Sequence, residues 1–131
     1  MTEQFDPDNP PEVPEGISKS TMRELPFSLV LTDPNLHDHP IICVNRAFEK
    51  LTGFTSKMAA GRNCRFLQGE KTDAAHRQII RNAIDEEKEC TLDIINYRAN
   101  GEKFVNRLMI TPLRNDDGKM TLLSRHSDRT T

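Results

Sequence analysis

Two groups of residues in this sequence carry side chains whose types and spacing could do chemistry. The first is the stretch GRNCRFLQG, residues 61–69, where the thiol of Cys64 lies among amide and guanidinium side chains. The second is a pair of asparagines, Asn96 and Asn106, each flanked by apolar residues in a segment that alternates like a strand. A buried amide without a partner costs on the order of 1–3 kcal/mol, so an inward pair modestly favours a polar ligand.

Each group also has an ordinary structural explanation. A lone cysteine beside apolar residues is usually a packed side chain, and surface arginines are common. Inward asparagines most often close a backbone turn or bond a water molecule. The segment HDH, residues 37–39, contains candidate metal ligands, but it lies in a polar loop without further ligands in range. The predicted helices and strands around these residues are needed to distinguish between these explanations.

The composition limits the class of protein. The chain has 131 residues, enough for one domain, and a formal net charge of −2 with both signs interspersed. No concentration of lysine and arginine indicates binding to nucleic acid or to an anionic membrane surface. No apolar run approaches the roughly 18 residues that span a bilayer. Its three cysteines are odd in number and far apart, which fits a reducing compartment. We therefore expect a cytoplasmic protein with neither nucleic-acid nor membrane partners.

The N-terminal part differs in composition from the rest. Residues 1–20 hold four prolines and five carboxylates, and they offer few apolar side chains to bury. We predict a flexible acidic, proline-rich tail over 1–18, a possible N-terminal cap over 19–26, and the domain itself over 27–131.

Within the domain, hydrophobic spacing predicts two strands, three helices and three further strands. FSLVLTD and PIICVN are typical of strands, the second with an apolar run that suggests burial on both faces. NRAFEKLTGF predicts a helix that stops at Gly53, and CRFLQG predicts a short helix that ends in glycine. The longest helix begins after Thr72 or Asp73 as N-cap. Its apolar stripe comprises Ile79, Ile80, Ala83 and Ile84.

The turn at Asn100-Gly101 fixes how the next two strands pair. A two-residue turn would send Asn96 and Asn106 to opposite faces of the sheet. A three-residue loop, with Gly101 in the left-handed region, pairs Asn96 with Phe104 and places both amides on one face. The predicted fold class is α+β, a five-stranded antiparallel sheet with short helices packed on one face around a pocket.

The segments TDP, NRAFEKLTGF, GRNCRFLQGEKTD, IINYRANGEKFVNRL and DGK resemble, in order and spacing, the light-oxygen-voltage (LOV) subgroup of PAS domains. The resemblance covers about residues 27–130. It implies a blue-light photoreceptor that binds flavin mononucleotide (FMN) noncovalently, with Cys64 adding reversibly to the flavin on illumination. Such a protein is a sensory module and not an enzyme, and no metal site is expected.

The resemblance also implies a role for each site residue. Arg65 and Arg81 match the phosphate clamp, which Arg77 could join from four positions earlier on the helix. Asn63 and Gln68 match positions that bond the ribityl chain and ring edge, and Asn96 and Asn106 suit the uracil-like edge. The apolar slot would be formed by Val30, Thr32, Leu67, Ile80, Ile84, Ile94 and Leu108.

The sequence departs from the family where a last-strand glutamine usually contacts the flavin. Anchoring on SDRT puts His126 there, whereas a gap-free count from Gly118 puts Ser127 there. We prefer His126, because it shares an alternating face with Leu122 and Ser124. A histidine titrating near neutrality would make the lifetime of the light-induced state depend on pH.

The output of such a sensor is less defined by the sequence. The resemblance favours a homodimer formed through the exposed sheet face, and a downstream kinase or regulator absent from this chain. The chain would then be a short receptor or the sensor module of a bacterial histidine kinase. The alternatives are a flavin-binding redox or ligand sensor with altered light coupling, and a PAS interaction domain with an empty pocket.

Overall fold

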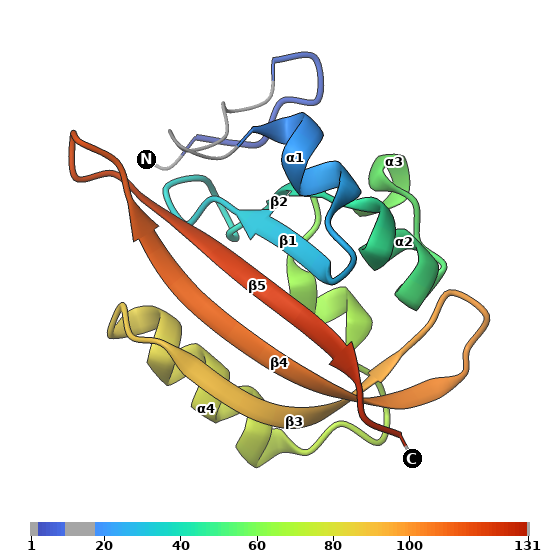
Figure 1. Cartoon of the computed structure of the whole chain (residues 1–131). Coiled ribbons are helices and arrows are strands. Elements are labelled where there is room, and N and C mark those ends of the chain that lie inside the picture. The colour runs from blue at the N-terminus through green and yellow to red at the C-terminus, as the bar shows by residue number, and fades with distance from the viewer. Residues whose placement is uncertain (1–2, 10–17, 131) are drawn as a thin grey trace.

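The computed structural model describes residues 3–9 and 18–130. Five antiparallel strands form one sheet in the order β2-β1-β5-β4-β3 (Figure 1). Their bounds are β1 Ser28–Thr32, β2 Ile41–Val44, β3 Cys90–Tyr97, β4 Lys103–Arg114 and β5 Met120–Asp128. The predicted α+β class and five-stranded antiparallel sheet are confirmed.

The helices lie on both faces of this sheet. The inner face is covered by α2 (Arg46–Thr52), α3 (Ser56–Ala59), the 3-10 helix η1 (Cys64–Leu67) and α4 (Ala74–Asp85). The outer face of β1 and β2 is covered by α1 (Lys19–Glu24), where the sequence suggested a short cap. Alternation in β1 separates the two cores, since Val30 packs inward while Leu29 and Leu31 contact Met22 of α1.

Side-chain caps set where the inner helices begin. Asn45, Asn63 and Asp73 each accept a backbone N–H at the start of α2, η1 and α4, respectively. Helix α2 ends at Gly53, whose φ of 79° is the left-handed conformation that glycine adopts without strain. The predicted stop at Gly53 and the Asp73 cap are confirmed.

The register of the β3–β4 hairpin is the one that the three-residue loop predicted. Ile94 pairs with Asn106 and Asn96 pairs with Phe104. Gly101 has a φ of 87°, and its N–H donates to the carbonyl of Arg98. Both asparagine side chains therefore lie on the inner face of the sheet.

Some local predictions differ from the structure. Ile79 is 49% exposed and not part of the core. Helix α4 turns Ile80 and Ile84 toward the sheet, so Ile79, about 100° round the helix from Ile80, faces solvent. Helix η1 ends at Leu67, before the glycine that was expected to terminate it, because Gln68 is already extended. The apolar run of β2 is fully buried only at its two ends.

The N-terminal segment also makes contacts that the sequence did not indicate. Glu3 forms a parallel bridge with Leu36, and the His37 N–H donates to the Glu3 carbonyl at 2.6 Å. The ring of Phe5 lies against Gly61. Within the expected tail, Glu3 thus contacts the β1–β2 loop and Phe5 contacts the segment between α3 and η1, whereas residues 10–17 lie outside the described residues.

Candidate functional site

A cavity of about 490 Å³ lies between α4, η1 and the inner face of the sheet. All but three of the residues predicted for the site line it: Thr32, Asn63, Cys64, Arg65, Leu67, Gln68, Arg77, Ile80, Arg81, Ile84, Asn96, Leu108 and His126. The exceptions are Val30, Ile94 and Asn106, which are almost completely buried and do not reach the cavity surface. Val30 and Ile94 belong to the cores behind it, and Asn106 bonds to its neighbours.

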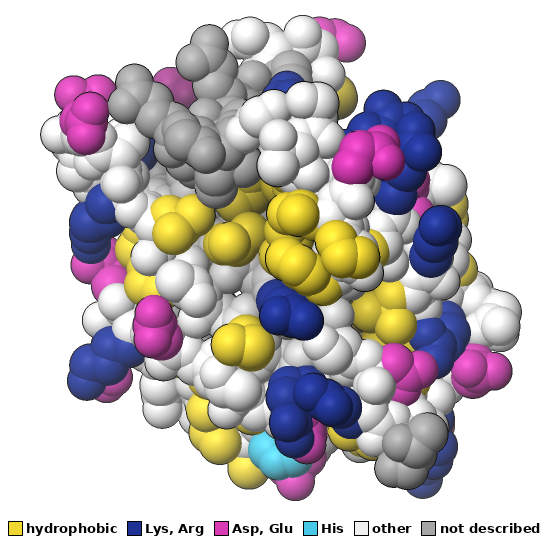
Figure 2. Space-filling model, in the orientation of Figure 1, with side chains coloured by type: hydrophobic (Ala, Val, Ile, Leu, Met, Phe, Trp, Pro, Cys, Tyr) yellow, Lys and Arg dark blue, Asp and Glu magenta, His cyan; other side chains and the backbone are white. Residues whose placement is uncertain are grey.

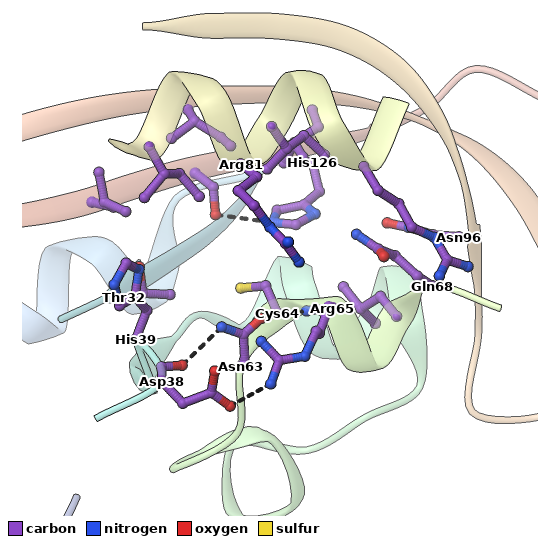
Figure 3. Close-up of a pocket in the computed structure, with 18 of the residues that line it drawn as sticks. Thr32, Asp38, His39, Asn63, Cys64, Arg65, Gln68, Arg81, Asn96 and His126 are labelled. Atoms are coloured by element: carbon purple, nitrogen blue, oxygen red, sulfur yellow. Dashed lines mark hydrogen bonds and ion pairs between the residues drawn. The ribbon is translucent and has the colours of Figure 1, made fainter. Parts of the chain in front are cut away.

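Cys64 opens helix η1 and points into the cavity (Figure 3). Its position follows from the Asn63 cap, whose Oδ1 accepts the Arg65 N–H at 2.9 Å. Burial raises the pKa of the Cys64 thiol to about 12. The sulfur therefore stays protonated at neutral pH, and it is not a pre-formed thiolate nucleophile.

The rim beside Cys64 is organised by Asp38, which the sequence analysis did not assign to the site. The Asn63 Nδ2 donates to the Asp38 carbonyl at 2.8 Å, and the Arg65 guanidinium pairs with the Asp38 carboxylate (Figure 3). The hydrogen bond from Arg65 holds the pKa of Asp38 below its usual value. Arg65, which was expected to bind a phosphate, is thus paired with the carboxylate of Asp38.

Two further arginines reach the cavity from α4. The Arg77 Nη2 donates to the Gly69 carbonyl at 2.9 Å, which joins the helix to the end of η1. Arg81 extends from α4 into the cavity, opposite Cys64, Asn63 and Arg65 (Figure 3). Cationic groups therefore approach the cavity from both sides.

Across the cavity, the polar side chains of β3, β4 and β5 form one connected network. The Asn106 Nδ2 donates to Asn96 Oδ1 at 2.9 Å and lies 2.8 Å from His126 Nδ1. The Ser127 N–H donates to Asn106 Oδ1 at 3.0 Å, and His126 Nε2 lies 3.1 Å from Ser124 Oγ. Of these side chains, Asn96, Ser124 and His126 line the cavity.

His126 occupies the inward position that the alternation of β5 predicted. It is 3% exposed, and burial lowers its pKa to about 4. The imidazole is therefore neutral from mildly acidic to basic pH. The expectation that it titrates near neutrality is wrong, because residue spacing alone does not show how completely the imidazole is buried.

Six residues line the cavity without having been predicted: Asp38, His39, Asp85, Ile110, Leu122 and Ser124. Three of them, Ile110, Leu122 and Ser124, share an alternating strand face with a predicted residue, so strand parity was a usable signal. Asp38 and His39 lie in a loop with positive φ values of 62° and 46°, which periodicity does not describe. The segment HDH does not form a metal site: within residues 3–9 and 18–130, no group of three acidic, histidine or cysteine side chains is arranged to hold a metal ion.

The PAS domain profile matches residues 26–125. A blue-light-activated histidine kinase of Brucella canis is 50% identical over 92 residues, which cover 70% of this chain and 19% of that protein. The solved LOV domain of the Erythrobacter litoralis EL346 blue-light activated histidine kinase is 43% identical with a TM-score of 0.78. That match covers 82% of this chain and 100% of the solved domain.

A structure of an RNA-binding light-oxygen-voltage receptor is more distant, 31% identical with a TM-score of 0.80 over 92% of this chain and 36% of that one. The chain belongs to the PAS domain family and, within it, to the LOV domains. It spans about a fifth of the length of the curated kinases that it matches. In the part of the chain that the structure describes, no helix is long and apolar enough to cross a membrane.

Proposed function

We propose that this protein senses blue light through noncovalently bound FMN and that Cys64 is the residue that reacts. The observation that carries the proposal is the position of a protonated thiol at the wall of a cavity whose other walls hold amides and arginines. The LOV relatives, named as blue-light-activated kinases, support the same conclusion.

The residues present fit a flavin nucleotide. A cavity of about 490 Å³ lies in the usual range for small-molecule sites. The apolar residues that line it suit a flat aromatic ring system: Leu67, Ile80, Ile84, Leu108, Ile110 and Leu122. Asn96 and Gln68 would hold the polar edge of the ring, since each amide can donate and accept.

The phosphate would lie near the arginines. Arg81 and Arg65 offer planar donor groups that match phosphate oxygens, and Arg77 lies one helical turn from Arg81. Asn63 is placed to bond the ribityl chain. Val30, Ile94 and Asn106 would support this site from behind the cavity surface.

A bound flavin would supply light absorption and, once excited, a ring carbon that can form a bond with sulfur and a ring nitrogen that can take up the hydrogen lost from the thiol. The protein contributes the rest. Helix η1 holds the Cys64 sulfur at the cavity wall, so the reaction needs no diffusion of a second partner. The raised pKa keeps the proton on the thiol at neutral and basic pH, so a change of pH in this range would not produce a thiolate.

We further propose that the protein signals to a downstream kinase or regulator and that it forms a homodimer. The outer face of the sheet supports the second statement. Hydrophobic side chains gather across the middle of that face, among charged groups (Figure 2). Leu123 of β5 packs in the hydrophobic cluster beside α1. The outward positions of β3 and β4 add further hydrophobic residues to this face: Ile95, Val105, Met109 and Leu113.

The absorption spectrum of the purified protein, before and after blue light, tests the proposal. Protein loaded with FMN should be yellow, should lose its visible band on illumination and should regain it in darkness. Cys64→Ala should keep the colour and lose the bleaching, while the control Cys90→Ala, in β3, should behave as wild type.

Two results would replace the proposal with an alternative. A yellow protein whose spectrum never changes would be a flavin-binding sensor of another kind. A protein that refuses FMN altogether would be an interaction domain.

A further inference from the structure

Ser124 is a buried polar residue of the cavity to which no role has been assigned. It lies in β5, is 6% exposed, and its side chain lines the cavity next to His126. Its Oγ lies 3.1 Å from His126 Nε2. Which of the two atoms donates this hydrogen bond depends on the tautomer of the imidazole.

The neighbours of His126 determine that tautomer. A backbone N–H can only donate, so the Ser127 N–H requires the oxygen of the Asn106 side chain on its side, at 3.0 Å. The Asn106 NH₂ group then faces Asn96 Oδ1 at 2.9 Å and His126 Nδ1 at 2.8 Å. An NH₂ group has only hydrogens to offer, so His126 Nδ1 must accept.

The hydrogen of the neutral imidazole is therefore on Nε2. It is donated to Ser124 Oγ, which acts as the acceptor. Both ring nitrogens of His126 are used within the protein. Two donors of this network have no partner among the described residues, and both belong to side chains that line the cavity. They are the Ser124 hydroxyl hydrogen, in β5, and the second hydrogen of Asn96 Nδ2, whose first hydrogen goes to the Ile95 carbonyl.

We propose that Ser124 is the ligand-binding residue of β5 and that His126, held as the Nε2–H tautomer by Asn106, is the residue that positions it. This inference rests on the proposed function, because the ligand is taken to be the flavin ring. It assigns the contact to a residue two positions before the one where the resemblance places it. Because the His126 Nε2–H donates to Ser124 Oγ, the Ser124 hydroxyl hydrogen is left to donate to the flavin ring.

The tautomer is tested directly by the nitrogen chemical shifts of His126 in the full 131-residue chain, in darkness, with and without FMN. His126→Gln identifies the signals by their loss. We expect a protonated Nε2 and an unprotonated Nδ1 at neutral pH in both samples. A hydrogen on Nδ1 would overturn the inference, even if the protein bound no flavin.

The binding role is tested with Ser124→Ala and two ligands, FMN and riboflavin, which lacks the phosphate. Loss of one neutral hydrogen bond should weaken both ligands alike, by about threefold to tenfold. The control Ser127→Ala makes the same change on the opposite face of β5 and keeps its backbone N–H. It should bind both ligands as wild type does.

Unchanged affinity of Ser124→Ala would overturn the role of Ser124, and so would loss confined to FMN. Failure of the wild type to bind either ligand would end the proposed function as well as this binding role. The tautomer measurement would then still decide whether His126 is held as described. The two failures are therefore distinguishable.

Discussion

At the scale of single residues, burial keeps two titratable side chains neutral over a wide pH range. Burial raises the pKa of Cys64 to about 12, so its thiol stays protonated in basic solution as well, and it lowers the pKa of His126 to about 4, so its imidazole stays neutral in mild acid. Both shifts have the same cause, since a charge in the cavity wall would lose its hydration. Before illumination, neither Cys64 nor His126 therefore places a charge beside the proposed flavin position at neutral pH.

The pKa of His126 predicts acid sensitivity of the fold. Below about pH 6.5 the unfolded chain binds a proton at this histidine, whereas the folded protein does not until about pH 4. The free energy of unfolding should fall as pH drops through this window, by about 3 kcal/mol in total, and should not vary with this group above it.

Urea unfolding at a series of pH values measures this effect. His126→Gln should show a shallower loss of stability between pH 6.5 and 4 than wild type, whatever its stability at pH 7. Identical slopes would mean that His126 titrates in the same way folded and unfolded.

The ion pair at the rim predicts a change in ligand preference. Asp38 holds Arg65 and places a negative charge where a phosphate would come. Asp38→Asn, which tolerates the same φ of 62°, should bind FMN about threefold to tenfold more tightly at low salt and leave riboflavin unchanged.

The matched control is Asp93→Asn, which breaks the Asp93–Arg107 pair between β3 and β4. It should change neither affinity. Weaker FMN binding by Asp38→Asn would instead mean that the carboxylate orients Arg65 for the phosphate.

At the scale of elements, one buried side chain joins α1, α2 and β1. Asn45 Oδ1 accepts the N–H groups of Leu29 and Phe48, and its Nδ2 donates to the carbonyls of Met22 and Phe27. Asn45→Ala should lower the free energy of unfolding by about 3–5 kcal/mol, because it leaves several backbone groups unpaired.

Chemical denaturation compares this variant with Thr55→Ala, which removes the exposed cap of α3 and should cost about 1 kcal/mol. Hydrogen exchange in α1 should also accelerate in Asn45→Ala. Equal losses for the two variants would contradict the linking role of Asn45.

The elements also show what a sequence can predict here. The loop ending in Gly101 determines the register of β3 and β4, so the inward position of Asn96 followed from counting. For His126 counting left two alternatives, and its alternation with Leu122 and Ser124 chose the correct one. The buried face of α4 was not predicted correctly from residue spacing. A helix beside a cavity buries a narrower stripe of side chains than a helix packed on a full core, and Ile79 lies outside that stripe. Contacts such as Asp38 with Arg65 join residues 27 positions apart through a loop without periodicity.

At the scale of the whole molecule, the sheet separates two surfaces with different roles. The inner face encloses the candidate ligand site, and the outer face carries α1 and the hydrophobic side chains seen in Figure 2. Ser124 and His126 lie on the inner face of β5, with Leu123 and Arg125 on the other side of the same strand. A change at the ligand therefore has a short path to the outer surface.

The proposed homodimer gives a prediction at this scale. Met109, 42% exposed on β4, lies in the outer hydrophobic surface, so Met109→Glu should convert a dimer to monomers by placing a charge in the interface. Light scattering after size-exclusion chromatography measures the mass. Met58→Glu, at a residue of α3 that is 46% exposed, is the control and should keep the wild-type mass. A monomeric wild type at micromolar concentration would contradict the dimer.

The central claim is that one protonated sulfur, that of Cys64, forms a bond after light absorption. Light-minus-dark infrared spectroscopy of the FMN-loaded protein observes S–H stretching directly, and each of the three cysteines contributes its own band. The account predicts that illumination removes one S–H band, that darkness restores it, and that Cys64→Ala lacks this change. A bleached flavin with every S–H band intact would contradict the claim.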